Sequence, residues 1–180
     1  MTVPFFDMFE DDRGFIWLAT MHGVRKYDGT SVSLFEQQPG KKGSIVPGHI
    51  GILAKSRRAG GLWLGSNEMG VSYWDIPSEQ ALNFLPEPND PGSLFSGEIG
   101  GLVEDADGGL WVGTGKFTLH YLSVSGNLSE QNTFRRIKPP LPPNAPPAFG
   151  NEDMLGKIIC DRFDNNKLWI GCRYGVYHFN

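Results

Sequence analysis

The feature that most constrains the fold of this 180-residue chain is a repeated tryptophan motif. In four of its five tryptophans, an aliphatic residue stands on either side of the indole and two small residues follow. These four are separated by 46, 48 and 58 residues: Trp17, Trp63, Trp111 and Trp169. Repeats of about 40 to 50 residues are typical of β-propeller blades. The spacing therefore predicts one supersecondary unit that occurs four times.

A turn is expected three residues before each tryptophan, at Gly14, Gly60, Gly108 and Asn166, because glycine and asparagine enter left-handed backbone most readily. Apolar segments precede the turns at residues 5–9, 50–54, 99–103 and 155–160, and third strands follow at 24–27, 71–74, 119–122 and 176–179. Fourth strands are predicted at 31–35, 81–85 and 133–137. Each unit is thus predicted to be a four-stranded antiparallel blade, with the four framed tryptophans as packing residues.

The fold predicted for residues 1–180 is a single all-β domain, a β-propeller of four repeats at about 4–36, 49–86, 98–138 and 154–180. The fourth repeat stops after its third strand, so the last blade is expected to lack its outer strand. An unclosed ring exposes strand edges and an apolar face, which proteins avoid. Three arrangements stay open: a small ring, half of an eight-bladed dimer, or a fragment of a larger propeller.

A proline-rich segment at residues 137–151 accounts for the longest spacing between repeats. We interpret it as a rigid loop between the third and fourth blades. The alternative is a docking peptide, because Pro140 to Pro143 fits the P-x-x-P pattern of extended ligands.

Charge and composition exclude several classes of protein. The formal net charge is −4, and no basic run exceeds two residues, which speaks against nucleic-acid binding. No apolar run reaches the ~18 residues of a membrane span, so no membrane contact is expected of this chain. Acidic residues stand where a signal peptide would be basic, which predicts a cytoplasmic location for the chain as given and an extracytoplasmic one if it is an excerpt of a sensor.

Beyond the tryptophan frame, the sequence resembles a known family. The run NDPGSL at residues 89–94, then Ile99, then VEDADGGLWVGT at 103–114 resembles the two-component regulator propeller repeat, and residues 10–14 and 23–28 carry a looser copy. The second repeat departs from it with Arg57-Arg58-Ala59 in place of the acidic turn, and the third has Thr118 where the pattern has glycine. The resemblance implies a propeller of the kind that senses ligands, often glycans, outside the cytoplasm ahead of a membrane-spanning histidine kinase.

Several groups that could bind metal have simpler explanations, so no cofactor and no metal is expected. The Asp105-x-Asp107-Gly108 cluster lacks the further oxygens of a calcium loop. Hydrogen bonds that Asp12, Asp107 and Asp164 accept from their own turns explain these carboxylates. Cys160 and Cys172 are expected on adjoining strands that could face each other, more as buried thiols than as a strained disulfide. His120 and His178, each nine residues after a tryptophan, are expected on exposed strand faces.

The remaining polar residues fall in loops that meet at one mouth of a propeller channel, where ligands commonly bind. These are the loops between second and third strands and the connections between blades. The candidate ligand-binding residues are His22, His49, Asn67, Glu68, Glu98, Lys116, Phe117, Arg173 and Tyr174, with Asp153 beside them. Such a mixture of donors, acceptors and aromatic rings suits a polysaccharide, an oligosaccharide or a peptide.

Three functions are therefore weighed. The first is a non-catalytic ligand-binding or sensing module. The second is a stand-alone propeller that assembles with itself or another protein through its open edge by strand addition. The third is a lyase in which His22 acts with Glu68 or Tyr174 as base and acid.

Overall fold

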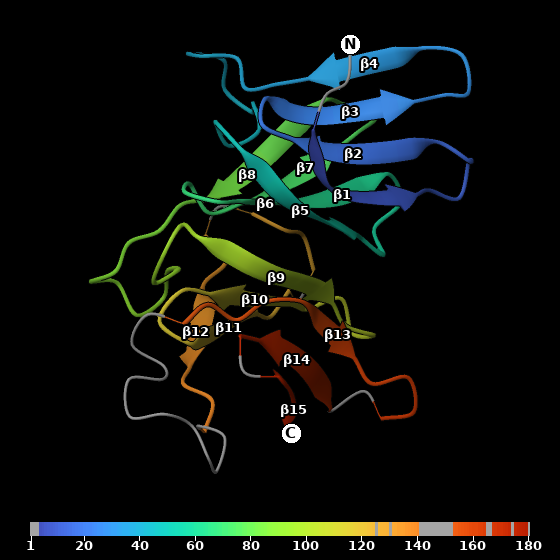
Figure 1. Cartoon of the computed structure of the whole chain (residues 1–180). Coiled ribbons are helices and arrows are strands. Elements are labelled where there is room, and N and C mark those ends of the chain that lie inside the picture. The colour runs from blue at the N-terminus through green and yellow to red at the C-terminus, as the bar shows by residue number, and fades with distance from the viewer. Residues whose placement is uncertain are drawn as a thin grey trace.

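The structure is a computed structural model, and it describes residues 4–124, 126–129, 131–140, 153–164, 167–173 and 175–179. All of its regular elements are β-strands, arranged as four antiparallel sheets around a propeller axis (Figure 1). Since these residues form no helix, none of them provides a helix that is long and apolar enough to cross a membrane.

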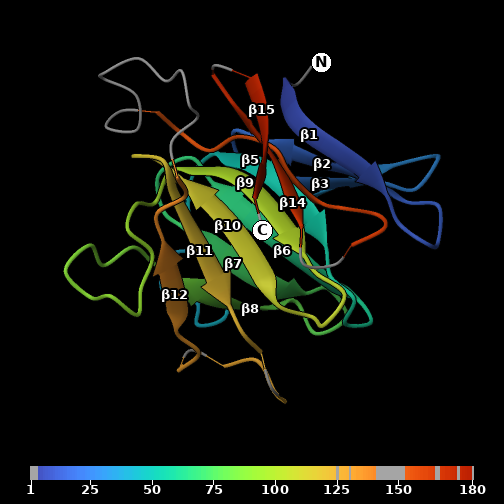
Figure 2. The ribbon, with the colours of Figure 1, turned by 90° about the horizontal axis from the view of Figure 1, so that it is seen from below.

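Each sheet corresponds to one predicted repeat. Blade 1 contains β1 (Phe5–Glu10), β2 (Ile16–Thr20), β3 (Gly23–Tyr27) and β4 (Val32–Phe35). Blade 2 contains β5 (Ile50–Lys55), β6 (Gly61–Ser66), β7 (Val71–Asp75) and β8 (Gln80–Phe84). Blade 3 contains β9 (Ile99–Glu104), β10 (Leu110–Thr114), β11 (Thr118–Leu122) and β12 (Phe134–Ile137), which lie side by side in Figure 2. Blade 4 contains β13 (Ile158–Cys160), β14 (Leu168–Cys172) and β15 (Gly175–Phe179).

The predicted fold is confirmed, including the last blade with its three strands. Gly14, Gly60 and Gly108 have φ angles of 81°, 75° and 81°, so each turn before a tryptophan strand contains the expected left-handed glycine. Asn166, the corresponding residue of blade 4, lies outside the described residues. Of the proline-rich segment, residues 137–140 are described and residues 141–151 are not.

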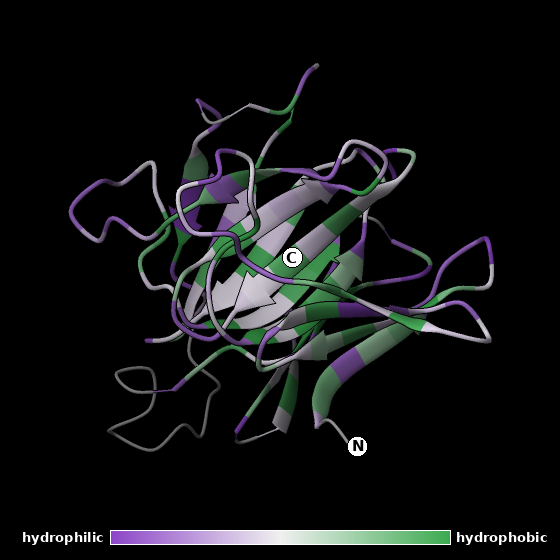
Figure 3. Ribbon diagram, turned by 90° about the horizontal axis from the view of Figure 1, so that it is seen from above, coloured by the Kyte–Doolittle hydropathy of each residue, from purple (hydrophilic) through white to green (hydrophobic). Residues whose placement is uncertain are grey.

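Successive blades pack face to face, and each interface contains one hydrophobic cluster. The cluster between blades 1 and 2 joins Trp17 to Ile50 and Leu53, and the cluster between blades 2 and 3 joins Trp63 to Ile99 and Leu102. In Figure 3 the hydrophobic residues lie mainly on the strands, while many of the loops are hydrophilic. The innermost strands of blades 2, 3 and 4 therefore bury apolar side chains against the preceding blade.

Among the residues that the structure describes, none forms such a neighbour for the outer faces of the first and last blades. Met8 in β1 is equivalent to Leu53 in β5 and Leu102 in β9, because each pairs with the same position of the second strand of its blade. Met8 is nevertheless 57% exposed, whereas Leu53 and Leu102 are at most 5% exposed. At the other end of the arc, Trp169 is 41% exposed, while Trp17 and Trp63 are at most 1% exposed. Packing of the indole, as predicted, is thus complete in blades 1 and 2 and partial in blade 4.

The expectation for His120 is wrong, because His120 is fully buried. The loop between the second and third strands is one residue longer in blade 3 than in blade 1, so Trp111 pairs with Tyr121 whereas Trp17 pairs with Lys26. A shift of one residue along a strand moves a side chain to the opposite face of the sheet. His120 therefore faces the interior, where its Nε2 accepts a hydrogen bond from the N–H of Phe95 at 3.0 Å. His178 is exposed, as expected.

The two cysteines do not face each other. Cys160 lies opposite Leu168 in the β13–β14 ladder, whereas Cys172 lies opposite Gly175 in the β14–β15 ladder. The β13–β14 ladder pairs residues on either side of position 164 rather than 166, and this offset separates the thiols along the strands. Both are free and half-buried, and burial raises the pKa of the Cys160 thiol, as does the nearby charge of Asp105.

Candidate functional site

The predicted mouth is built from equivalent loops of all four blades. The loops between the second and third strands contribute His22 in blade 1, Asn67 and Glu68 in blade 2, Lys116 in blade 3 and Arg173 in blade 4. All of these side chains are exposed. Because the same hairpin recurs in equivalent blades, these loops lie at the same end of the sheets. Tyr174 belongs to this loop of blade 4 but lies outside the described residues.

Contacts between the loops and the inter-blade connections bring several of these residues together. His49 Nδ1 lies 3.2 Å from Asn67 Nδ2, and the backbone N–H of Asn67 donates to the carbonyl of His49 at 3.1 Å. The connection between blades 2 and 3 passes close to Glu68. A Cβ on Gly97, which lies in this connection, would be only 1.9 Å from the Glu68 carbonyl oxygen. Glu98, the residue after Gly97, is exposed at this end. No hydrogen bond, ion pair or ring contact joins His22 to the other candidates in the part of the chain that the structure describes.

The loop of blade 3 has an unusual backbone. Lys116 and Phe117 have φ angles of 54° and 50°, in the left-handed region that residues other than glycine seldom adopt. Phe117 is fully buried against the core of blades 3 and 4, and its N–H donates to the carbonyl of Asp153 at 2.7 Å. Phe117 thus holds the loop in place rather than facing the mouth, while Lys116 extends to the surface with its Nζ 5.3 Å from the centre of the Phe95 ring.

A cavity of about 440 Å³ opens between the loops at the same end of blade 4. Arg173 and Asp153 contribute the charged part of its wall, and Met154 and Cys172 the less polar part. Two residues that the sequence assigns to the mouth, Arg173 and Asp153, therefore line a concave part of it.

The opposite end of the blades carries carboxylates that hold the tryptophans. Asp11, Asp105 and Asp161 accept hydrogen bonds from the indole Nε1 of Trp17, Trp111 and Trp169 at 2.9, 3.2 and 2.7 Å. Each also accepts backbone N–H groups of its own turn. The sequence predicts hydrogen bonds to their own turns for Asp12, Asp107 and Asp164, whereas in the structure the first carboxylate of each turn forms these bonds and also binds the tryptophan.

These hydrogen bonds favour the ionised carboxylates. In Asp161 the N–H of Phe163 and the indole of Trp169 lower the pKa of the carboxyl group. Partial burial acts to raise the pKa of Asp11, but its hydrogen bonds to Trp17, Phe15 and Arg13 outweigh burial, and the pKa is lowered.

Blade 2 has no carboxylate in its turn, since Ser56 occupies the position of these aspartates. Glu104, at the end of the innermost strand of blade 3, replaces it from the neighbouring blade. Its carboxylate accepts hydrogen bonds from Trp63 Nε1 at 2.6 Å, Ser56 Oγ at 2.7 Å and the Arg57 N–H at 2.9 Å. The residue at the same position in blade 2, Lys55, likewise reaches the preceding blade and pairs with Asp12 at 2.5 Å.

A larger cavity, of about 770 Å³, lies at this end between blades 1 and 2. Its wall contains Arg13, Phe15, Lys26, Lys55, Arg57 and Arg58. Sequence reasoning missed this site because it took the blade 2 turn as a departure from the family pattern. The pair Arg57-Arg58 in place of an acidic turn was the available signal.

No described group of three or more histidine, cysteine, aspartate or glutamate side chains is arranged to hold a metal ion. The cluster around Asp105 is occupied by the Trp111 indole and by backbone N–H groups of its own turn.

Comparison with known proteins supports the family resemblance and gives the fold. A family profile described as two component regulator propeller matches residues 93–116, which confirms the resemblance noted in the sequence. A search of curated proteins found no match.

Solved structures similar to this chain include extracellular domains from B. thetaiotaomicron. The extracellular domain assigned to the hybrid two component system BT3049 is 20% identical, with a TM-score of 0.72 over 100% of this chain and 25% of that one. The extracellular domain assigned to the one component system BT4673 is 14% identical, with a TM-score of 0.65 over 97% of this chain and 21% of that one. The chain thus spans about a quarter of their length.

A gluconolactonase, XC5397 of Xanthomonas campestris, is also similar in fold. It is 13% identical, with a TM-score of 0.59 over 96% of this chain and 55% of that one. The chain is therefore a four-blade β-propeller that carries a two component regulator propeller repeat and shares its fold with extracellular domains of such systems.

Proposed function

We propose that this chain is a non-catalytic ligand-binding part of an extracytoplasmic sensor propeller, with its ligand at the mouth formed by the loops around His22, Glu68, Lys116 and Arg173. The strained loop of blade 3 is the observation that carries this proposal. Left-handed backbone at a residue other than glycine costs of order 1 to 3 kcal/mol, and such strain clusters at ligand clamps and active sites. Here it presents the charged side chain of Lys116 at the mouth while burying Phe117.

The side chains at the mouth indicate the class of ligand. The loops of the mouth expose imidazole, amide, carboxylate, ammonium and guanidinium groups, and Arg173 and Asp153 line a cavity of about 440 Å³ in blade 4. This combination suits a polar oligosaccharide or a short peptide. Similarity to domains of two-component systems supports a sensing role over a catalytic one.

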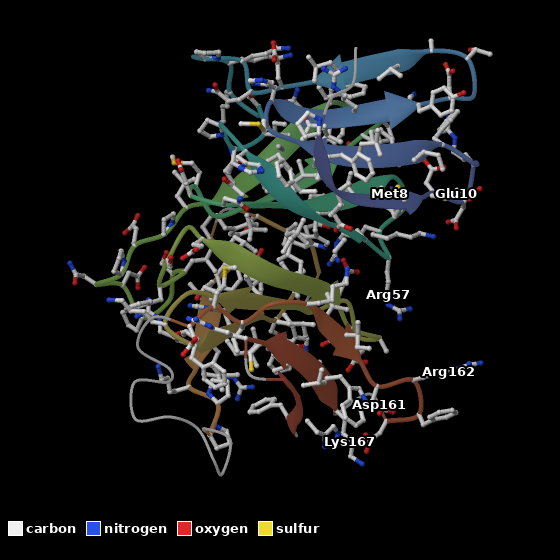
Figure 4. All side chains as sticks on the ribbon, in the orientation of Figure 1. Met8, Glu10, Arg57, Asp161, Arg162 and Lys167 are labelled. Carbon is white, nitrogen blue, oxygen red and sulfur yellow. The ribbon has the colours of Figure 1, made fainter. Side chains whose placement is uncertain are left out.

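Binding of a panel of neutral oligosaccharides and short peptides, followed by NMR titration, tests the proposal. We expect His22→Ala, Glu68→Ala and Arg173→Ala to weaken binding about tenfold or more where the side chain hydrogen-bonds the ligand. Glu10→Ala and Arg162→Ala are matched controls, because these exposed residues lie at the opposite end of the blades (Figure 4). Unchanged affinity in all three mouth variants would remove the site.

Self-association is a second candidate function, and the exposed faces of blades 1 and 4 favour it. Phe5 and Met8 of blade 1 are 51% and 57% exposed, although the corresponding residues of blade 2, Ile50 and Leu53, are buried against blade 1. In blade 4 the face around Ile159 and Trp169 is exposed as well. We propose that blade 1 of one copy packs on blade 4 of a second copy, face to face rather than by strand addition.

Charge complementarity supports this pairing. Glu10 occupies the position of Glu104, which binds the turn of the preceding blade, and the turn of blade 4 offers Arg162 and Lys167 on the same side of the molecule (Figure 4). Sedimentation velocity should give twice 19.9 kDa for the protein, and Met8→Asp should give a monomer. Leu85→Asp, a change at an exposed apolar residue of blade 2, should leave the dimer intact. A monomer of the unaltered chain at tens of micromolar would refute this assembly.

A further inference from the structure

We infer that the cleft between blades 1 and 2, at the end opposite the mouth, is a second binding site, specific for ligands that carry two or more anionic oxygen groups. Its volume of about 770 Å³ lies within the ~300 to 1,000 Å³ of small-molecule sites. The turns of two neighbouring blades form its walls, with the Trp17 ring between them.

The charge of the wall is positive, although the whole chain is negative. Five basic residues line the cleft against three acidic ones, which gives a net charge of +2 where the chain carries −4. Each of the three carboxylates is already occupied. Asp11 accepts from Trp17, Arg13 and Phe15, Asp12 pairs with Lys55, and Glu104 accepts from Trp63, Ser56 and Arg57.

Three of the cations have no such partner. Arg13, Lys26 and Arg57 form no ion pair with any carboxylate among the residues that the structure describes. The Arg13 guanidinium and the Lys26 ammonium lie 5.2 and 4.6 Å from the centre of the Phe15 ring. Both charges thus lie near the same aromatic ring, which does not neutralise them.

Glu104 allows the turn of blade 2 to contain two arginines. A turn of this kind needs a carboxylate for its tryptophan and for its backbone N–H groups, as blades 1, 3 and 4 show. Since Glu104 supplies that carboxylate from blade 3, the turn itself can carry Arg57 and Arg58. Arg57 projects from the tip of its turn (Figure 4), while the Arg58 guanidinium lies 3.9 Å from Glu104.

This arrangement selects the ligand by charge and geometry. Guanidinium groups bind carboxylate and sulfate oxygens through two parallel hydrogen bonds, which an isolated ammonium does not provide. Arg57 on one wall and Arg13 with Lys26 on the other can each hold one anionic group, so a ligand with two groups spans the cleft. Free polycarboxylates and acidic oligosaccharides share this chemistry.

Isothermal titration calorimetry at low salt distinguishes these sources with three probes: citrate, a trimer of galacturonic acid, and the neutral trisaccharide maltotriose. We expect at least one anionic probe to bind and maltotriose not to bind at this site, with affinity falling as salt is raised because charges attract less strongly. Preference for citrate identifies a free polycarboxylate, and preference for the uronic acid trimer identifies an acidic saccharide.

Arg57→Gln and Lys26→Gln should each lower the affinity about tenfold or more. Arg135→Gln is the matched control, since it removes the same charge from an exposed residue of β12 that lies outside the cleft. Thermal unfolding of each variant checks that the fold is kept. Arg173→Ala should leave this binding unchanged, so that failure at the mouth and failure at the cleft are separable. Absence of binding by both anions, or equal loss in Arg135→Gln, would overturn the inference.

Discussion

The indole N–H of Trp63 donates its hydrogen bond to Glu104, a residue of the next blade, whereas Trp17, Trp111 and Trp169 use an aspartate of their own turn. One carboxylate thus stabilises a buried indole, a turn and the interface between two blades.

Glu104→Ala should lower the free energy of unfolding by about 3 kcal/mol, because it leaves buried donors of Trp63 and Ser56 without an acceptor. Glu104→Gln keeps one acceptor oxygen and should cost about 1 kcal/mol. Chemical denaturation measures both, with Glu87→Ala, at an exposed glutamate, as a control that should change stability by less than about 0.5 kcal/mol. A loss of similar size in Glu87→Ala would contradict the role given to Glu104.

The tryptophans should differ in their contribution to stability according to burial. Trp63→Ala should cost about 3 to 5 kcal/mol, as for other large core side chains. Trp169→Ala should cost less than half as much in the monomer, because this side chain is already 41% exposed. Equal losses from the two substitutions in thermal unfolding would mean that the Trp169 face is covered.

Stability should fall as the pH is lowered from about 6.5 to 4, and His120 should account for part of this loss. Burial, aided by the charge of Arg136, lowers the pKa of His120 from 6.5 to about 4. The unfolded chain therefore binds a proton in this window that the folded chain does not, so acid favours unfolding. The contribution is fully present above pH 6.5.

The size of this effect is on the order of 3 kcal/mol. His120→Gln retains an acceptor for the Phe95 N–H but does not titrate, so it should flatten the dependence of the melting temperature on pH between 6.5 and 4. Parallel curves for the variant and the unaltered protein would show that His120 is not responsible.

Relief of strain at Lys116 should stabilise the protein. Left-handed backbone at an ordinary residue costs about 1 to 2 kcal/mol, and glycine avoids this while adding about 0.4 to 1 kcal/mol of chain entropy to the unfolded state. Lys116→Gly should therefore raise the free energy of unfolding by about 0.5 to 1 kcal/mol and weaken ligand binding at the mouth. Lys42→Gly, at an exposed position without positive φ, should give no gain.

Much of the fold could be predicted because the repeated elements obey local rules. The tryptophan frame, the left-handed glycines and the strand positions follow from period and turn chemistry, and each can be recognised without knowledge of the neighbouring blades. The position of His120 could not, because one extra residue in the preceding loop reverses which face a side chain takes, and a spacing measured from Trp111 does not show where that residue is accommodated.

The mouth was predicted from loop position alone, and the structure places its exposed candidates on equivalent loops, with Phe117 buried. The basic cleft escaped prediction because it depends on a contact between residues 41 positions apart, Trp63 and Glu104. From the sequence alone, Arg57-Arg58 is only a departure from the acidic turn of the repeat. In the structure, Glu104 stabilises the turn that carries these two positive charges.

The last residue of each innermost strand also bears on how four such similar units fold in the right order. This position is occupied by Glu10, Lys55, Glu104 and Cys160 in blades 1 to 4. In blades 2 and 3 its charge is complementary to the turn of the preceding blade: Lys55 pairs with Asp12, and Glu104 binds the turn that contains the arginines. A blade 2 strand misplaced on its own kind of turn would bring Lys55 against Arg57 and Arg58. Like charges at that contact would disfavour this wrong neighbour, so the charges at Lys55 and Glu104 favour the observed order of blades 1, 2 and 3 over an exchange of repeats with nearly the same shape.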